Sequence, residues 1–180
     1  MPLLFGNTAS AGLGSTTSYE SISSQLLTSA APYVEFSSIP STYRHLQVRI
    51  SSIGNGTTLV ARYNSDTGSN YSFHRFANFY NDTFETAGQG TRTSLAVQYT
   101  GNNNDATQFA GIMDIFDYSN GTTWTTFVNQ NGIDGNGSGN LGTWSGAWFS
   151  TAVVTTIRFY PEDGSNLFAN SRFSLYGIKG

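Results

Sequence analysis

Short runs of alternating apolar and polar residues recur along this 180-residue chain, and clusters of Asn, Gly, Ser and Asp separate them. The clearest example is the stretch 62–75, in which the runs 59–63 and 71–76 flank Asn-Ser-Asp-Thr-Gly-Ser-Asn. Asn, Asp and Gly tolerate left-handed backbone and close Asx turns, so this stretch predicts a β-hairpin with a structured tip. Its Tyr63 and Phe73 are expected to face the core.

The same rhythm predicts about ten short strands and no amphipathic helix. The strongest run is 43–50, where Leu46, Val48 and Ile50 point inward. The pair at 55–56, Asn-Gly, indicates a type I′ turn. Many strands with connections of variable length favour an all-β, jelly-roll-like antiparallel β-sandwich.

Two further strands and two loops are also expected. The segment 109–118 is nearly apolar on both faces and predicts a central strand, and the β-branched run 153–160 predicts another. The segments 81–93 and 132–142 are rich in Asn, Gly and Thr, and both are predicted to be loops.

The first 17 residues differ from the rest in composition. An apolar head with Leu3, Leu4 and Phe5 leads into a tail of Gly, Ser, Ala and Thr, which predicts an extended N-terminal arm or tether over 1–17. The head lacks the basic flank and long apolar core of a signal peptide, and no apolar run approaches a membrane span. Residues 18–180 are then expected to form a single β-sandwich domain.

Composition narrows the classes of function. Charged residues make up 11% of the chain, against about 25% in a typical soluble domain, whereas aromatic residues reach 14%. A net charge of −3 does not favour nucleic acid as a partner. A surface with so few charges is either neutral and polar or buried in an assembly. The absence of cysteine excludes disulfides and thiolate metal sites.

No pattern of titratable residues indicates catalysis, and the chain is predicted not to be an enzyme and to need no cofactor. His45 lies on the outer face of a predicted strand, His74 alternates with Ser and Phe, and no Gly-x-Ser-x-Gly elbow is present. Asp114 and Asp117 are three residues apart in one predicted strand, so they face opposite ways and cannot act as a pair. One of them is expected to point inward and to be hydrogen-bonded.

Two loops resemble ligand sites only loosely. The segment 134–140 places oxygen ligands at alternate positions, as calcium loops do, but it lacks the closing glutamate. Asn64 and Asp66 offer a weaker version of the same pattern. Gly-rich turn structure is the favoured interpretation of both segments, so no metal site is predicted.

The tryptophans raise the question of sugar binding. Trp124, Trp144 and Trp148 could each offer a stacking platform. Trp144 and Trp148 share one face of a predicted strand, with Gly146 between them. That spacing favours a core layer or a subunit interface over a sugar site.

Three stretches, 36–49, 62–71 and 173–179, together resemble small structural proteins of tailed bacteriophages, which share an Asp-Thr-Gly-Ser-Asn-Tyr turn and a terminal Leu-Tyr-Gly-Ile-Lys. The similarity extends from about Tyr19 to the end. It implies a β-sandwich virion component that is assembled in the bacterial host cytoplasm and is a homotrimer. It implies no catalytic residues and leaves head and tail locations open.

Two hypotheses follow from this resemblance. In the first, the protein decorates or cements the capsid and contacts the major capsid protein, with neither nucleic acid nor membrane as a partner. Its arm and self-association hold it in place. In the alternative, a tail or fibre module contacts host surface glycans through loops at 102–105 and 134–140. No group of residues in the sequence supports a third hypothesis, a free enzyme that acts on polysaccharides. The residues expected to serve assembly are Leu3, Leu4, Phe5, Arg62, Arg75, Trp144 and Trp148.

Overall fold

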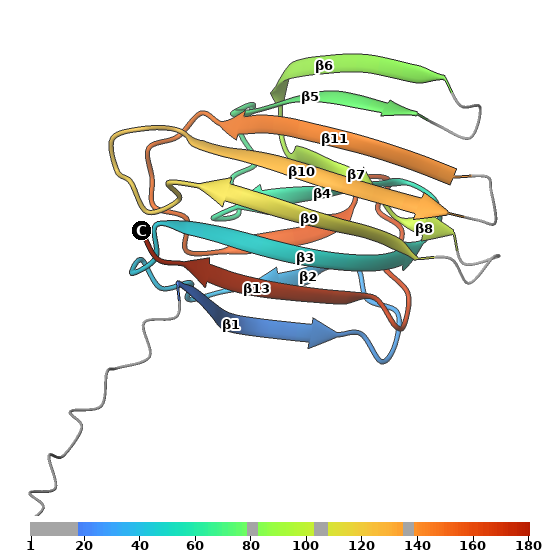
Figure 1. The fold of residues 1–180 in the computed structure, drawn as a ribbon, viewed down its shortest axis with the longest axis horizontal. Coiled ribbons are helices and arrows are strands. Elements are labelled where there is room, and N and C mark those ends of the chain that lie inside the picture. Colours follow the sequence, from blue (N-terminus) through green and yellow to red (C-terminus); the bar gives the residue numbers. More distant parts are fainter. Residues whose placement is uncertain (1–17, 79–82, 103–107, 135–138) are drawn as a thin grey trace, which may run out of the picture.

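The computed structural model describes residues 18–78, 83–102, 108–134 and 139–180, and these residues form thirteen strands and no helix. The strands make two antiparallel sheets that share one hydrophobic core (Figure 1). The expected all-β antiparallel sandwich is confirmed, with more strands than the ten or so that the sequence predicted. None of the described residues belongs to a helix long and apolar enough to cross a membrane.

The larger sheet has an eight-strand path with the first and last strands, β1 and β13, side by side at one edge (Figure 1). The predicted central strand, at 109–118, lies in the interior of this path, as expected. The two-residue strand β8 (Gly101–Asn102) pairs in parallel with the end of β3. In spatial order the path runs β1 (Tyr19–Leu26), β13 (Arg172–Ile178), β3 (His45–Gly54), β9 (Phe109–Phe116), β10 (Thr125–Asp134), β11 (Gly139–Trp148), β5 (Tyr71–Asn78) and β6 (Phe84–Arg92).

The smaller sheet covers the inner face of the larger one. Its third and fourth strands in spatial order, β4 and β7, pair with a register shift, and β7 contacts β9, β10, β11 and β5 of the larger sheet. In spatial order its strands are β2 (Val34–Phe36), β12 (Ile157–Pro161), β4 (Thr58–Tyr63) and β7 (Leu95–Tyr99).

Alternation along the strands explains which side chains form the core. Leu46, Val48 and Ile50 of β3 are buried, whereas the residues between them reach solvent, as predicted. Tyr63 of β4 and Phe73 of β5 also point into the core, as predicted. Burying each large apolar side chain contributes about 1.5–3 kcal/mol to folding.

The predicted hairpin at 62–75 and the predicted type I′ turn at 55–56 are both wrong, because the flanking strands lie in different sheets. The stretch 62–75 connects β4 of the smaller sheet to β5 of the larger one. The Asn55-Gly56 segment connects β3 of the larger sheet to β4 of the smaller one, and only Gly56 of the two has positive φ. A type I′ hairpin needs positive φ at both positions. Turn residues therefore set the local bend but not the pairing of the strands that follow.

Three other boundaries also differ from the prediction. Strand β6 lies inside the predicted loop 81–93, and β10 and β11 extend into the predicted loop 132–142. The predicted strand 153–160 becomes regular only at Ile157. In the segment before Ile157, the backbone N–H groups of Thr155 and Thr156 donate to the side-chain Oδ1 of Asn64, at 2.8 Å and 3.1 Å. This side chain takes the place of a neighbouring strand as their hydrogen-bond partner.

A group of polar side chains lies within the core under β9 and β10. Asn131 donates to Asn129 Oδ1 at 2.7 Å, and Gln98 of β7 donates to the Ser52 hydroxyl at 3.2 Å. Gly111 of β9 leaves the space for this glutamine, since a Cβ there would lie 2.1 Å from its Oε1. The Gln98 side chain therefore lies against the β9 backbone, in the space that a larger residue at this position would fill.

The two ends of the described sandwich meet. Tyr19 of β1 lies opposite Ile178 of β13, and the N–H of Lys179 donates to the carbonyl of Ser18 at 2.9 Å (Figure 1). An ion pair between Lys179 and Glu20 adds to this closure. Residues 1–17, with the predicted anchor residues Leu3, Leu4 and Phe5, lie outside the described residues, so the anchor stays a prediction.

Candidate functional site

The structure places the tryptophan pair of β11 in the core. Trp144 and Trp148 are 1% and 2% exposed, so neither offers a stacking face to a sugar. Trp148 packs edge-on against Tyr63, with ring centroids 5.7 Å apart, and is stacked on Tyr71 at 6.3 Å. Trp144 packs against Phe73 at 5.5 Å. Of the two favoured roles, core layer and subunit interface, the core is the one that these contacts show.

Asp66 organises the turn between β4 and β5. Its Oδ1 accepts the N–H of Gly68 at 2.8 Å, and its Oδ2 accepts the side-chain amide of Asn70 at 3.0 Å and the indole N–H of Trp148 at 2.7 Å. These bonds, that from Asn70 first, lower the pKa of the Asp66 carboxyl below its ordinary value. The carboxylate serves the turn itself.

The two arginines at the ends of this stretch are held within the chain. Arg62 donates from Nε to the carbonyl of Thr93 at 2.9 Å and lies over the ring of Tyr160. Arg75 donates to the Tyr99 hydroxyl at 3.2 Å and lies 4.0 Å from the carboxylate of Glu85. A carboxylate partner is thus present for Arg75. Contacts of either arginine with a neighbouring subunit stay a prediction.

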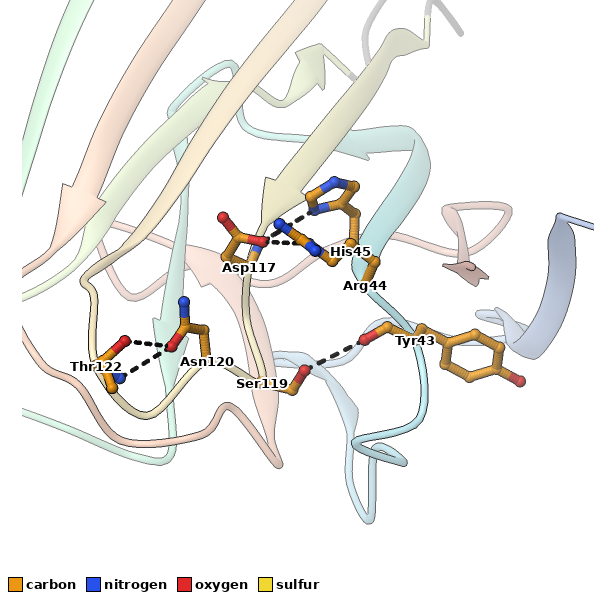
Figure 2. Close-up of polar contacts among 7 residues, drawn as sticks. All are labelled: Tyr43, Arg44, His45, Asp117, Ser119, Asn120 and Thr122. Carbon is orange, nitrogen blue, oxygen red and sulfur yellow. Dashed lines mark hydrogen bonds and ion pairs between the residues drawn. The ribbon is translucent and has the colours of Figure 1, made fainter. Parts of the chain in front are cut away.

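A polar cluster forms where β3 begins and β9 ends (Figure 2). Arg44 donates from Nε to Asp117 Oδ1 at 2.8 Å, and the backbone N–H of Asp117 donates to His45 Nδ1 at 3.1 Å. Accepting at Nδ1 is possible only for the neutral imidazole. Asp117 holds this position with a φ of 50°, a left-handed conformation that aspartate tolerates better than most residues.

This cluster does not have the connections of a catalytic triad. The hydroxyl of Ser119 donates to the carbonyl of Tyr43 at 3.2 Å instead of to His45 (Figure 2). Asn120 closes an Asx turn by accepting from Thr122. A shallow hollow of about 220 Å³ lies beside these residues, with Arg44 and Asp117 in its wall.

The prediction that Asp114 or Asp117 points inward is wrong. Asp114 lies on the outer face of β9 and accepts from the Gln47 side chain at 2.8 Å, and Asp117 lies beyond the strand. Both carboxylates therefore reach solvent and avoid the cost of burial. Within the described ranges, no group of three or more His, Cys, Asp or Glu side chains is placed to hold a metal ion.

The outer face of the larger sheet is broad and nearly uncharged over β10, β11 and β5. Strand alternation puts mostly neutral side chains there, and the titratable groups are His74 and, at the end of β10, Asp134. Large apolar side chains are exposed on this face and its margins. They are Phe76, Phe84, Ile112, Phe116, Val128 and Leu141.

A hollow of about 630 Å³ opens on this face between β6, β5 and β11. His74 lies opposite Gly88 on one side and Ser145 on the other. A Cβ on Gly88 would lie 2.5 Å from the His74 ring, so the glycine makes room for the imidazole. Phe76, two residues on, lies between Thr86 and Thr143. These six residues, together with Arg75 and Ala87, line what we call the β5 hollow.

An exposed aromatic platform borders the β5 hollow. The rings of Phe76 and Phe84 stack with centroids 4.7 Å apart and planes 8° apart, and they are 53% and 51% exposed. The sequence prediction missed the hollow because it missed β6. The sequence did contain a signal for the β5 side of the hollow, because Ser72, His74 and Phe76 alternate with the buried residues of that strand.

No protein-family model, curated protein or solved structure matches the chain.

Proposed function

We propose that the protein is a non-enzymatic structural component of a bacteriophage virion, and that it decorates or cements the capsid. The observation that supports this best is the nearly uncharged part of the outer face of the larger sheet, over β10, β11 and β5. Burying such a face removes few charges from water, so association avoids the main desolvation cost. Its exposed apolar side chains add a favourable contribution when they are covered.

In this proposal the protein acts as a homotrimer and contacts the major capsid protein. The outer face packs between neighbouring copies, and the arm 1–17 reaches from the start of β1 to an adjacent subunit. The particle is assembled in the cytoplasm of the bacterial host, and the protein remains in the virion. The resemblance of 36–49, 62–71 and 173–179 to phage structural proteins supports this setting.

The location and copy number of the protein in purified particles test the proposal. We expect immunogold labelling over the capsid and a copy number that matches the capsid symmetry. Labelling confined to the tail, at a few copies per particle, would overturn the cement function. Deleting residues 2–15 should release the protein from particles but leave its circular dichroism spectrum unchanged. Normal incorporation of the shortened chain would exclude the anchor.

The β5 hollow favours a second candidate function, a tail or fibre module that contacts host surface glycans. Its neutral, hydroxyl-rich walls and exposed Phe76 suit a sugar better than the buried Trp144 and Trp148 do. Trp124, the third tryptophan, is 56% exposed and packs edge-on against Phe149 at 4.9 Å. The predicted tip loops, at 102–105 and 134–140, lie largely outside the described residues.

A further inference from the structure

We propose that the β5 hollow binds a neutral sugar ring of a glycan. Phe76 would stack on the apolar face of the ring, and Thr86, Thr143, Ser145 and His74 would bond its hydroxyl groups. This inference deepens the second candidate function and rests on it only for the biological source of the glycan. Binding itself is a property of the isolated protein.

The size and position of the hollow suit a small ligand. A volume of about 630 Å³ lies within the range of about 300–1,000 Å³ that is typical of ligand sites. Strand pairing fixes the walls on three adjacent strands, because His74 and Phe76 of β5 lie between partners in β6 and β11. The polar groups therefore keep their spacing in the absence of a ligand, which reduces the entropy lost on binding.

The polar groups of the hollow are available to a ligand. In the part of the chain that the structure describes, no hydrogen bond engages the hydroxyls of Thr86, Thr143 and Ser145 or the imidazole of His74. Each hydroxyl can donate and accept, and a neutral imidazole does both through its two nitrogens. Sugar hydroxyls have the same dual capacity, so the two sets of groups are matched in chemistry.

The charge of the walls selects a neutral ligand. The guanidinium of Arg75 turns to the opposite face, where it contacts Tyr99 and lies 5.3 Å from the Trp144 ring. Apart from Arg75, no residue that lines the hollow has a carboxylate or a permanent positive charge. An acidic sugar would therefore lose hydration without gaining an ion pair.

The apolar wall supplies the remaining interaction. Phe76 is held against Phe84 in a stacked pair, so its ring orientation is set before binding. The carbon-bound hydrogens on one face of a pyranose can cover such a ring and remove apolar surface from water. A second copy of the chain would also cover the ring, and this alternative is an outcome of the test below.

The test measures glycan binding by the full chain. An array should carry immobilised neutral oligosaccharides of glucose, galactose, mannose and N-acetylglucosamine beside sialylated and uronic-acid oligosaccharides. We expect retention on one or more neutral structures and none on the acidic ones. Titration of the best neutral oligosaccharide should show about tenfold weaker binding for Phe76→Ala and about threefold weaker binding for Thr143→Val.

Matched substitutions outside the hollow serve as controls. Phe116→Ala and Thr126→Val change an aromatic ring and a hydroxyl on the same sheet face. Both should bind the oligosaccharide within about twofold of the unchanged protein. Thermal unfolding of each variant identifies misfolded protein. Thr143→Val nearly conserves the shape of the side chain, so this variant still tests the proposal if Phe76→Ala does not fold.

Three outcomes would overturn the inference. The first is the absence of binding to any neutral structure, which leaves the capsid proposal untouched. The second is binding that survives both hollow substitutions, which places the glycan elsewhere, as at Trp124. The third is a fall in oligomeric mass for Phe76→Ala without glycan binding, which assigns the hollow to a second copy.

Discussion

The indole N–H of Trp148 donates to Oδ2 of Asp66 at 2.7 Å, which joins the last residue of β11 to the turn between the two sheets. Because β4 and β5 belong to different sheets, this turn is a covalent connection between the two sheets. The bond therefore fixes the relative placement of the sheets at one point of the sandwich.

Replacing Asp66 with Ala should lower the free energy of unfolding by about 3 kcal/mol. The substitution removes three bonds to a charged acceptor and leaves the indole N–H of buried Trp148 without a partner. Urea denaturation followed by tryptophan fluorescence measures the change. Asp163→Ala, which removes an exposed turn carboxylate bonded to Ser165, should cost less than about 1 kcal/mol. Equal decreases in the free energy of unfolding for the two variants would contradict the proposed link between Asp66 and Trp148.

Stability should fall in acid through the same carboxyl group. Hydrogen bonds lower the folded-state pKa of Asp66 below its ordinary value of 3.8. Its contribution is therefore complete above that ordinary value and is lost as the pH falls through the lower, folded-state pKa. Asp66→Asn should be less stable than the unchanged protein at pH 7, and the difference should shrink as the pH approaches 2. A constant difference across this range would refute the assignment.

Gly146→Ala should destabilise the protein by about 3 kcal/mol or more. A Cβ at this position would lie 2.1 Å from the carbonyl oxygen of Ser72 and 2.6 Å from the ring of Phe127, so β5 or β11 must shift. Gly90→Ala is the matched control, because no atom lies within 4 Å of its added Cβ. Thermal unfolding compares the two variants. A normal melting temperature for Gly146→Ala would show that the strands can separate without cost.

Asn64→Ala should cost more stability than Asn64→Asp. The asparagine Oδ1 accepts the N–H groups of Thr155 and Thr156, and its Nδ2 donates to the carbonyl of Val153 at 2.8 Å. Aspartate keeps the acceptor, whereas alanine loses every side-chain bond and is disfavoured at a φ of 50°. We expect losses of about 3 kcal/mol for alanine and about 1 kcal/mol for aspartate. Chemical denaturation gives both values, and the reverse order would disprove the capping role.

Val128→Lys should reduce self-association without unfolding the protein. Asp114 lies directly opposite Val128 in the ladder, so the new ammonium group has a cross-strand partner within the monomer. Covering that charge in an interface would cost several kcal/mol. Sedimentation equilibrium should show monomers for this variant and trimers for Thr93→Lys, an exposed control outside the outer face. Persistent trimers in Val128→Lys would exclude this face as the interface.

The sequence correctly predicted the strands in which apolar and polar residues alternate and the buried residues are all apolar. It identified the inward residues of β3 and the burial of Tyr63 and Phe73, because each strand has one apolar face. It missed the far half of β10, where Asn129 and Asn131 are buried and interrupt the apolar pattern. It also missed β6, which is exposed on both faces and therefore has no alternation to detect.

The pairing of strands and the β5 hollow required the structure. A turn such as 62–75 sets a local bend, but long-range packing decides which sheet the next strand joins. The Trp144 and Trp148 pair shows the same limit, because an aromatic face can pack inside one subunit or between two, and spacing along the chain is the same in both cases. His74 and Gly88 are brought together only by the β5 and β6 pairing.

The meeting of Ser18 with Lys179 makes the backbone of the sandwich nearly closed on itself. A short bridge of glycine and serine between these positions would join the ends, and the exposed Asp163-Gly164 turn offers a place to open a new pair of termini. The pairing between strands holds each sheet together, and it does not depend on where the chain begins. The fold is therefore suited to circular permutation, and a fused cargo could be moved from the β1 and β13 edge to another part of the surface with the core intact.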